Sequence, residues 1–196
     1  QIQHDSYSLQ AGQDMPAFTG WTSTDTDVEW ARALVAQWDR ILTQESTAGA
    51  IYVRWAGLVD EAARDPLTPR AERQRLAEAG LRTTLERMTA EFGADRAQWR
   101  YGRVHASTLP HMFVAAFDLP TVERPGGFET VNATGANFRR IIDLSNLDNS
   151  VWSNSPGQSA QPGSPFYDNL RENLANGQYF PMLFTRAAVD GSAAYR

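Results

Sequence analysis

Apolar residues recur every three or four positions through much of the first half of the chain. Residues 1–24 carry Gly, Pro and Thr, which predict extended or irregular backbone. Thr26 and Glu29 then stand three residues apart, as in a capping box. The apolar stripe that follows consists of Val28, Ala31, Leu34, Val35, Trp38, Ile41 and Leu42. This spacing predicts an amphipathic helix that buries the stripe.

A second helix is predicted to begin at Ser46, a residue type that caps helix N-termini well. Its inner face would carry Ile51, Trp55, Leu58, Val59 and Ala62. Pro66 and Pro69 would prevent it from continuing, because proline lacks the backbone N–H that a helix interior needs.

A third helix is predicted after Thr68 and Pro69, a cap followed by a proline at the first helical position. Its apolar residues are Leu76, Leu81, Leu85, Met88 and Phe92. Gly93 is the expected C-cap, and Gly80 is expected to divide the helix in two. The helical part of the chain is therefore expected at about 25–93.

The strand and loop part is expected at about 94–196. Residues 128–133 and 138–144 have the alternating or centrally branched pattern of short strands, which would pair as a hairpin. Residues 165–176 are expected to form one short helix, and residues 179–184 a last buried extended segment. Helices followed by short strands predict the α+β class, or part of a layered sheet fold whose other strands lie elsewhere.

The polar stretch DLSNLDNSVWSNSPGQSAQPGSPFYDNL separates those last elements. It is rich in turn-forming residues, yet it contains Trp152, Phe166 and Tyr167. Long loops with aromatic residues are usually ordered by their own packing. We therefore expect residues 143–168 to be ordered, with Asp143 or Gln158 bonded to nearby backbone N–H groups and Trp152 or Tyr167 packed inward.

Burial can be predicted for four apolar residues that lie on these stripes or at a strand centre. They are Trp38, Trp55, Leu85 and Ile141. Each is expected to be largely buried.

Composition narrows the class of protein. The 196 residues carry a formal net charge of -5 and are 42% hydrophobic, which suits one globular domain or a large part of one. Mild acidity and scattered arginines argue against a nucleic-acid partner, and no apolar run is long enough to span a membrane. There is no Cys, so disulfides and thiol chemistry are excluded. The first residue is Gln1 and no signal peptide follows it, so we expect a processed product or a piece of a longer protein.

Candidate catalytic residues are few. Ser159 lies in a Gly-Gln-Ser-Ala turn that lacks the second glycine of a nucleophile elbow, and no strand leads directly into it. His105, His111 and Asp143 are the residues that would have to join it in a serine hydrolase. A structural turn is the favoured interpretation of Ser159.

Metal sites are not indicated. The spacing of His105 and His111 matches no zinc pattern, and no Cys accompanies them. Residues 143–150 lack the central glycine and terminal glutamate of a calcium-binding EF-hand loop. Asn132 begins a glycosylation sequon that lies within a predicted strand. The residues taken alone therefore nominate no catalytic, metal or cofactor site, and no cofactor is expected.

Several segments resemble a known family in a consistent order. They are IQHDSYSLQA (2–11), WDR (38–40), WRYGRVHASTLPH (99–111), FRRIIDLSNLDNSVW (138–152), GQS (157–159), SPFYDNL (164–170) and GQYFPMLFTR (177–186). Together these segments resemble the C-terminal part of the β chain of penicillin acylase-like amidases, which include penicillin, cephalosporin and acyl-homoserine-lactone acylases. The chain departs from that pattern at Ala160, where glycine is usual, at Phe166, where histidine is usual, and at 169–170. The connection between Thr134 and Phe138 is also shorter than is usual there.

The resemblance implies an N-terminal-nucleophile hydrolase with a four-layer αββα fold. In that family a precursor cleaves itself, and the new first residue of the β chain attacks an amide carbonyl with its own α-amino group as the base. Gln1 has no nucleophilic oxygen, and the family's nucleophile and oxyanion amide lie upstream of the part resembled here. Asn132 lies too late in the motif order to be that amide. The resemblance therefore places no catalytic residue in residues 1–196, leaves the substrate-binding residues unknown and implies no metal.

The same resemblance implies partners and a location. The partners would be the α chain and the remainder of the β chain of one precursor, with a small N-acyl substrate of the β-lactam side-chain or acyl-homoserine-lactone class. The enzyme would be periplasmic or secreted, with a role in antibiotic metabolism or quorum quenching. Residues 1–196 alone are expected to be inactive. Two alternatives stay open: a free-standing, non-catalytic binding or assembly module derived from this fold, and an unrelated α+β enzyme that uses His105 and Ser159.

Overall fold

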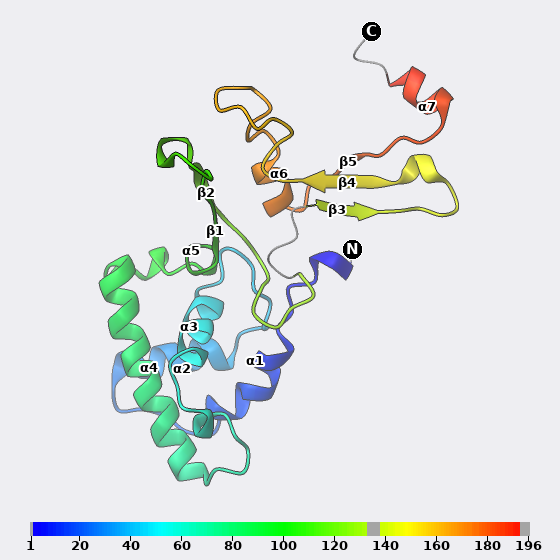
Figure 1. The fold of residues 1–196 in the computed structure, drawn as a ribbon. Coiled ribbons are helices and arrows are strands. Elements are labelled where there is room, and N and C mark those ends of the chain that lie inside the picture. The colour runs from blue at the N-terminus through cyan, green and yellow to red at the C-terminus, as the bar shows by residue number, and fades with distance from the viewer. Residues whose placement is uncertain (1, 133–137, 193–196) are drawn as a thin grey trace. The chain divides into compact units, whose positions relative to one another are not determined.

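The chain forms two compact units. The computed structural model describes residues 2–132 and 138–192. The first unit comprises Gln1–Ala106 and Glu123–Thr134, and the second comprises Ser107–Val122 and Gly135–Arg196 (Figure 1). The first unit is thus interrupted by residues 107–122, and each unit is described by itself below.

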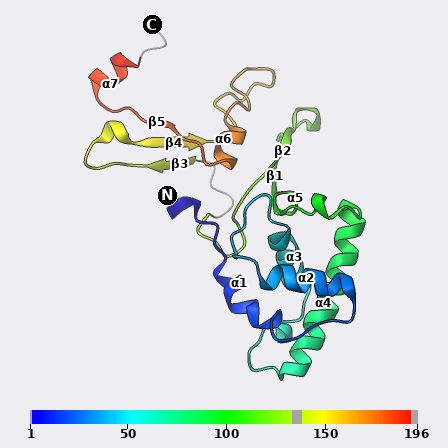
Figure 2. The ribbon, with the colours of Figure 1, turned by 180° about the vertical axis from the view of Figure 1, so that it is seen from behind.

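Helices dominate the first unit (Figure 2). The α-helices are α1 (Leu9–Asp14), α2 (Thr26–Ala36), α3 (Thr47–Ala56), α4 (Arg70–Phe92) and α5 (Tyr101–Val104). Short 3-10 helices, labelled η, connect them: η1 (Ile2–His4), η2 (Met15–Ala17), η3 (Glu61–Ala63) and η4 (Arg96–Gln98). The sequence pattern missed α1, because its six residues bury only Ala11 and Asp14 and Leu9 is exposed.

The first predicted helix begins where expected but ends early. Its N-cap is Asp25 rather than Thr26, and the Asp25 carboxylate accepts hydrogen bonds from the N–H groups of Asp27 and Val28. α2 ends at Ala36 because the chain then turns through Arg40, which has a positive φ of 68°. Residues 40–42 run antiparallel to residues 6–8, so Leu42 is buried from an extended segment.

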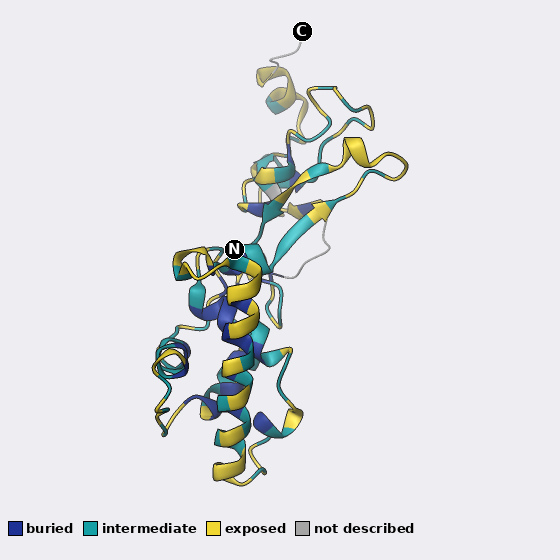
Figure 3. Ribbon diagram, turned by 90° about the vertical axis from the view of Figure 1, so that its left-hand side faces the viewer, coloured by how far each residue is buried: buried dark blue, intermediate teal, exposed yellow. Residues whose placement is uncertain are grey.

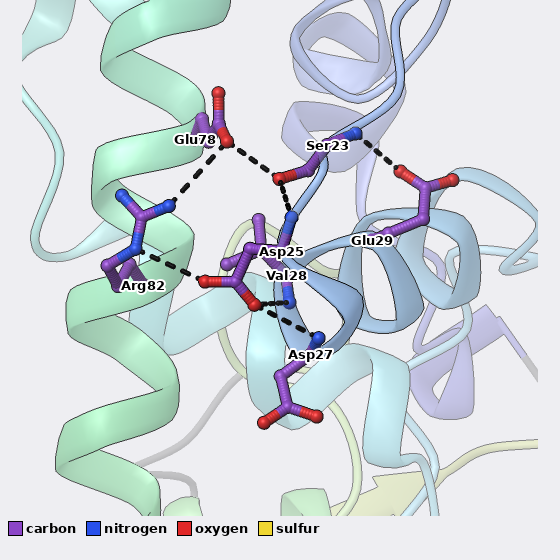
Figure 4. A network of polar contacts seen from close by, with 7 residues as sticks. All are labelled: Ser23, Asp25, Asp27, Val28, Glu29, Glu78 and Arg82. Atoms are coloured by element: carbon purple, nitrogen blue, oxygen red, sulfur yellow. Dashed lines mark hydrogen bonds and ion pairs between the residues drawn. The ribbon is translucent and has the colours of Figure 1, made fainter.

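A polar network joins the start of α2 to α4 (Figure 4). The Ser23 hydroxyl donates to Glu78 at 2.7 Å, and the Ser23 N–H donates to Glu29 at 2.9 Å. Arg82 of α4 donates to the Asp25 carboxylate at 3.4 Å and lies 3.6 Å from Glu78. The predicted capping box of Thr26 and Glu29 is therefore wrong: Asp25 is the N-cap, and Glu29 accepts from the Ser23 N–H.

Two of the predicted caps, Ser46 and Gly93, are confirmed, and a third is wrong: α4 begins at Arg70 with Pro69 as its N-cap residue, so Thr68 does not cap it. Ser46 caps α3 by accepting from the Gly49 N–H, and Gly93 ends α4 with a φ of +85°. α3 stops at Ala56, earlier than its apolar stripe, and α4 runs unbroken through Gly80. Gly80 packs against α3 and the residues after it: a Cβ at this position would lie 2.2 Å from Val59 Cγ1 and 3.0 Å from Trp55 Nε1. Gly80 thus permits close packing and does not divide the helix.

The core of the first unit lies between α2, α3 and α4, which contact one another pairwise. Its largest fully buried side chains are Trp55, Tyr52, Tyr101, Phe18, Leu42, Ile51, Leu81 and Met88. Trp55 donates its indole N–H to Ala77 O at 3.1 Å, which satisfies its one polar group. The buried stripe of α4 faces this core, and its other side is exposed (Figure 3). Burial of Trp55 and Leu85 is confirmed, and Trp38 is half-buried.

The predicted strand at 128–133 is wrong over its described residues, 128–132. These residues form turns, and Gly126, Gly127 and Glu129 all have positive φ values. The segment instead closes the first unit: Gly126 N–H donates to Leu42 O and Asn132 N–H to Asp5 O, each at 2.8 Å. Such long-range bonds override a local strand pattern.

The second unit contains most of the strands. β1 (Ala106–Leu109) and β2 (Leu119–Glu123) form one sheet, and β3 (Phe138–Ile141), β4 (Val151–Asn154) and β5 (Phe180–Pro181) form another in the order β3-β4-β5. Its helices are η5 (Ala115–Phe117), η6 (Leu147–Asn149), α6 (Arg171–Ala175) and α7 (Arg186–Gly191). The mixture of helix and strand confirms the α+β class.

The predicted hairpin of residues 128–133 with 138–144 is wrong, because strand β3 pairs with β4 instead. β3 pairs antiparallel with β4, with Phe138 opposite Asn154 and Ile141 opposite Val151. β4 lies inside the stretch predicted to be a loop, and its Trp152 ring lies 6.2 Å from Phe138 and 5.9 Å from Phe180. The burial prediction for Ile141 is wrong: it is 37% exposed, because β3 is an edge strand of a small sheet.

Two other predicted elements of the second unit are shorter than expected, and one of them is more exposed than expected. The helix expected at 165–176 is present only as α6. The segment at 179–184 is extended only at β5, and Phe184 is 70% exposed instead of buried. None of the described helices is long and apolar enough to cross a membrane.

The loop prediction is confirmed at its first turn. Asp143 accepts from the backbone N–H groups of Ser145 and Asn146 at 2.9 and 3.3 Å, and from the Ser145 hydroxyl at 2.6 Å. These bonds, together with one from Asn149, hold the pKa of Asp143 at about 2; the Ser145 hydroxyl is the largest cause. The Tyr167 hydroxyl donates to Phe117 O at 2.9 Å.

A second carboxylate in this turn holds the C-terminal segment. Asp148 accepts from the N–H groups of Phe184 and Thr185 at 2.7 and 2.8 Å, and from the Thr185 hydroxyl at 2.6 Å. These bonds, chiefly that of the hydroxyl, lower the pKa of Asp148. The loop therefore organises residues 36 or more positions away in the chain.

Candidate functional site

Ser159 lies in a backbone turn. The N–H groups of Gln158 and Ser159 both donate to Phe166 O, at 2.9 and 3.0 Å. The Ser159 hydroxyl oxygen accepts from the Gln161 N–H at 3.1 Å. The hydroxyl thus stabilises the turn, as the sequence predicts.

His105 is a half-buried residue of the first unit. Its Nδ1 lies 3.2 Å from Arg124 O, and its ring stacks on that of Tyr101 with the centroids 5.4 Å apart. Burial lowers the pKa of His105 below its ordinary 6.5. A neutral ring that donates to a backbone carbonyl serves to fix the fold around Gly127, whose Cβ position would be 2.8 Å from the His105 ring.

His111 belongs to the second unit and also contacts backbone. Its Nδ1 accepts from the N–H groups of Phe113 and Val114, at 3.2 and 3.0 Å. The backbone N–H of His111 donates to the Asp118 carboxylate at 2.7 Å. Since Nδ1 is the acceptor, the ring proton is on Nε2. Across residues 2–132 and 138–192 no cluster of three His, Asp or Glu residues could hold a metal ion.

Asn132 is a buried structural residue, only 5% exposed. Its side-chain Nδ2 donates to the Ser6 hydroxyl at 3.2 Å, and its backbone carbonyl accepts from the Gly127 N–H at 2.8 Å. Burial blocks access to the first residue of the sequon, and the remaining two residues of the sequon lie outside the described residues. The short connection between Thr134 and Phe138 lies outside them as well.

Among the residues that the structure describes, Asp14 is the most deeply buried charged group, and no sequence pattern predicted it. It is 2% exposed at the end of α1, and its carboxylate accepts from the Tyr52 hydroxyl at 2.7 Å, Arg64 Nε at 2.9 Å and Gln10 at 3.1 Å. These contacts join α1 to α3 and to the segment after η3. The partners are up to 50 residues apart, so no local spacing signals the cluster.

The Asp14 cluster opens into a groove of about 760 Å³, lined by Gln10, Gln13, Asp14, Val59, Glu61, Arg64, Asp65 and Pro66. Burial, followed by the Asp14 hydrogen bond, raises the pKa of Tyr52 far above its ordinary 10. Tyr52 therefore stays a neutral hydrogen-bond donor at physiological pH. The cluster is a structural tie between elements.

Comparison with known protein families identifies the family of the chain. The family model described as "Penicillin amidase" matches residues 1–191. The chain belongs to the penicillin amidase family, and its fold is therefore part of an N-terminal-nucleophile hydrolase fold.

One curated relative is the acyl-homoserine lactone acylase QuiP of Pseudomonas syringae pv. syringae. It is 29% identical over 107 residues, which cover 45% of this chain and 13% of the relative. The chain thus spans a small fraction of the length of the curated relative that it matches.

Proposed function

We propose that the chain is the C-terminal part of the β chain of an amidohydrolase that cleaves N-acyl compounds. The observation that carries the proposal is the family match over residues 1–191, combined with a relative of which the match covers only 13%. A catalytic centre of this class needs a hydroxyl and a free amine on one residue. Such a residue would lie upstream, outside residues 1–196.

The contacts of the candidate residues support a catalytic centre outside residues 1–196. Ser159, His105 and His111 each bond to backbone groups, so none is paired as nucleophile and base. The segment would supply the helical support and edge strands of the complete fold. Its partners would be the α chain and the rest of the β chain of one autoprocessed precursor, in the periplasm or outside the cell.

The substrate class that the comparisons support best is the acyl-homoserine lactones, because the relative carries that activity in its name. Its amide joins a fatty acyl group to a lactone ring. The β-lactam side-chain amides are the second candidate, since the family description refers to penicillin.

The test compares residues 1–196 with the complete precursor. Both are purified and assayed for amine release from phenylacetyl, glutaryl and long-chain acyl amides, including acyl-homoserine lactones. We expect turnover only by the processed complete protein. Turnover by residues 1–196 that is abolished in Ser159→Ala or His105→Ala would instead assign an internal serine hydrolase. An inert complete protein would favour a non-catalytic binding or assembly module.

A further inference from the structure

An apolar groove runs between α3 and α4 of the first unit, on elements that contact each other directly. Its volume is about 620 Å³, within the range of small-molecule sites. It is lined by Val53, Arg54, Gly57, Leu58, Arg87, Met88, Ala90, Glu91 and Val104. Met88 at its base is completely buried. The groove is therefore suited to an aliphatic chain.

The charged residues of the groove carry more positive than negative charge. Arg54 donates to Glu91 at 2.7 Å, so these two side chains neutralise each other in part. Arg87 is exposed and makes no ion pair within the described part of the chain. Arg54 Nε is buried and has no acceptor there. With two arginines and one glutamate, the groove carries a net positive charge beside its apolar surface, which complements an anionic ligand.

From this combination we propose that the groove binds an unbranched fatty carboxylate. The alkyl chain lies against Val53, Leu58 and Val104, above the buried Met88, and the carboxylate meets Arg87 and Arg54. A guanidinium is the side chain best suited to a carboxylate, because its planar donors match the two oxygens. This binding site is separate from the proposed catalytic role, and its test requires no turnover.

The experiment titrates residues 1–196 with hexanoate, octanoate and decanoate below their micellar concentrations, using methionine-methyl NMR and calorimetry. The Met88 methyl signal is expected to shift. Affinity is expected to rise about fourfold per added methylene, from the ordinary value of burying one CH2 group. Decanol, which has the chain without the charge, is expected to bind more weakly than decanoate.

Two variants separate the parts of the site. Arg87→Gln is expected to weaken decanoate about fivefold, the value of one exposed ion pair, and to leave decanol unchanged. Arg75→Gln is the matched control, because Arg75 is an exposed arginine of α4 outside the groove. Ala90→Trp places a large ring on the exposed groove wall and is expected to abolish binding of both ligands.

Three results would overturn the proposal: no shift of the Met88 signal, no dependence of affinity on chain length, or equal effects of Arg87→Gln and Arg75→Gln. Retained binding in Ala90→Trp would place the ligand elsewhere and overturn it equally. Since none of these measurements uses an amide substrate, their failure would leave the proposed amidohydrolase function untouched.

Discussion

Replacing Gly80 by alanine tests whether α4 is held by packing or by helix propensity. Gly80 lies in the interior of a 23-residue helix. Glycine at such a position is unfavourable, so alanine by itself should stabilise the helix by ~1 kcal/mol. The same methyl group, however, would stand 2.2 Å from Val59 Cγ1 and 3.0 Å from Trp55 Nε1.

The steric cost is expected to exceed the gain. Trp55 is completely buried and tied to Ala77 O, so its ring has little freedom to move. Val59 is only half-buried, but a contact of 2.2 Å requires it to shift. Overpacking of this kind typically costs about 1–3 kcal/mol. The balance predicts that Gly80→Ala destabilises the first unit by roughly 1 kcal/mol.

The assay is urea unfolding of residues 1–196, with amide hydrogen exchange in α4 as a probe specific to the first unit. Val59→Ala provides the rescue, because it removes the methyl group that clashes. Gly80→Ala made in the Val59→Ala background should lose its cost, with a coupling energy of about 1 kcal/mol or more. Ala79→Gly, on the exposed side of the same helix, is the propensity control and should cost ~1 kcal/mol.

A rise in stability on Gly80→Ala in the unmodified chain would refute the reasoning. So would a cost that persists unchanged in the Val59→Ala background, because Val59 would then not be the obstacle. Either result would mean that α3 and the residues after it do not pack on Gly80 as described.

The remaining predictions concern three polar residues. Glu29 should titrate with a pKa of about 2 by carboxyl NMR, chiefly because Arg32 donates to it. Its contribution to stability should be complete above about pH 4.3 and be lost as the pH falls towards 2. A titration midpoint near 4.5 would contradict this prediction. Asp148→Ala removes three hydrogen bonds and should speed hydrogen exchange of the Thr185 amide, whereas unchanged exchange would show that the turn does not hold the C-terminal segment. Ser159→Ala should leave the activity of the complete enzyme within a few-fold, and a loss of about a thousandfold would make Ser159 catalytic.

Local sequence signals predicted the helices well where a cap and an apolar stripe agree. Ser46 and Gly93 are such cases, and both act at the predicted helix ends. The prediction failed where distant segments decide the backbone. The stripe through Leu42 continues past the end of α2, because residues 40–42 pair with residues 6–8. Strand β4 was missed because its two apolar residues, Val151 and Trp152, stand within a long stretch of turn-forming residues.

The candidate functional residues show the same contrast between local and long-range contacts. The turn role of Ser159 and the bonding of Asp143 follow from side chains that reach only two or three residues along the chain. The Asp14 cluster could not be predicted, because its tyrosine and arginine lie 38 and 50 residues away. The family of the chain, shown by the match over residues 1–191, follows from the order of several segments along the sequence and not from the spacing of any single pair of residues.

The excursion of residues 107–122 out of the first unit has a consequence for synthesis on the ribosome. The helical contacts among α2, α3 and α4 are available once residue 92 has emerged. The last bonds of this unit come much later: Gln44 donates to Glu123 O at 2.8 Å, and Asn132 donates to Asp5 O at 2.8 Å across 127 positions. Pairings of such high contact order form slowly. A nascent chain of which only residues up to 107–122 have emerged would therefore carry a helical core that still lacks the bonds that join Asp5, Leu42 and Gln44 to residues 123–132.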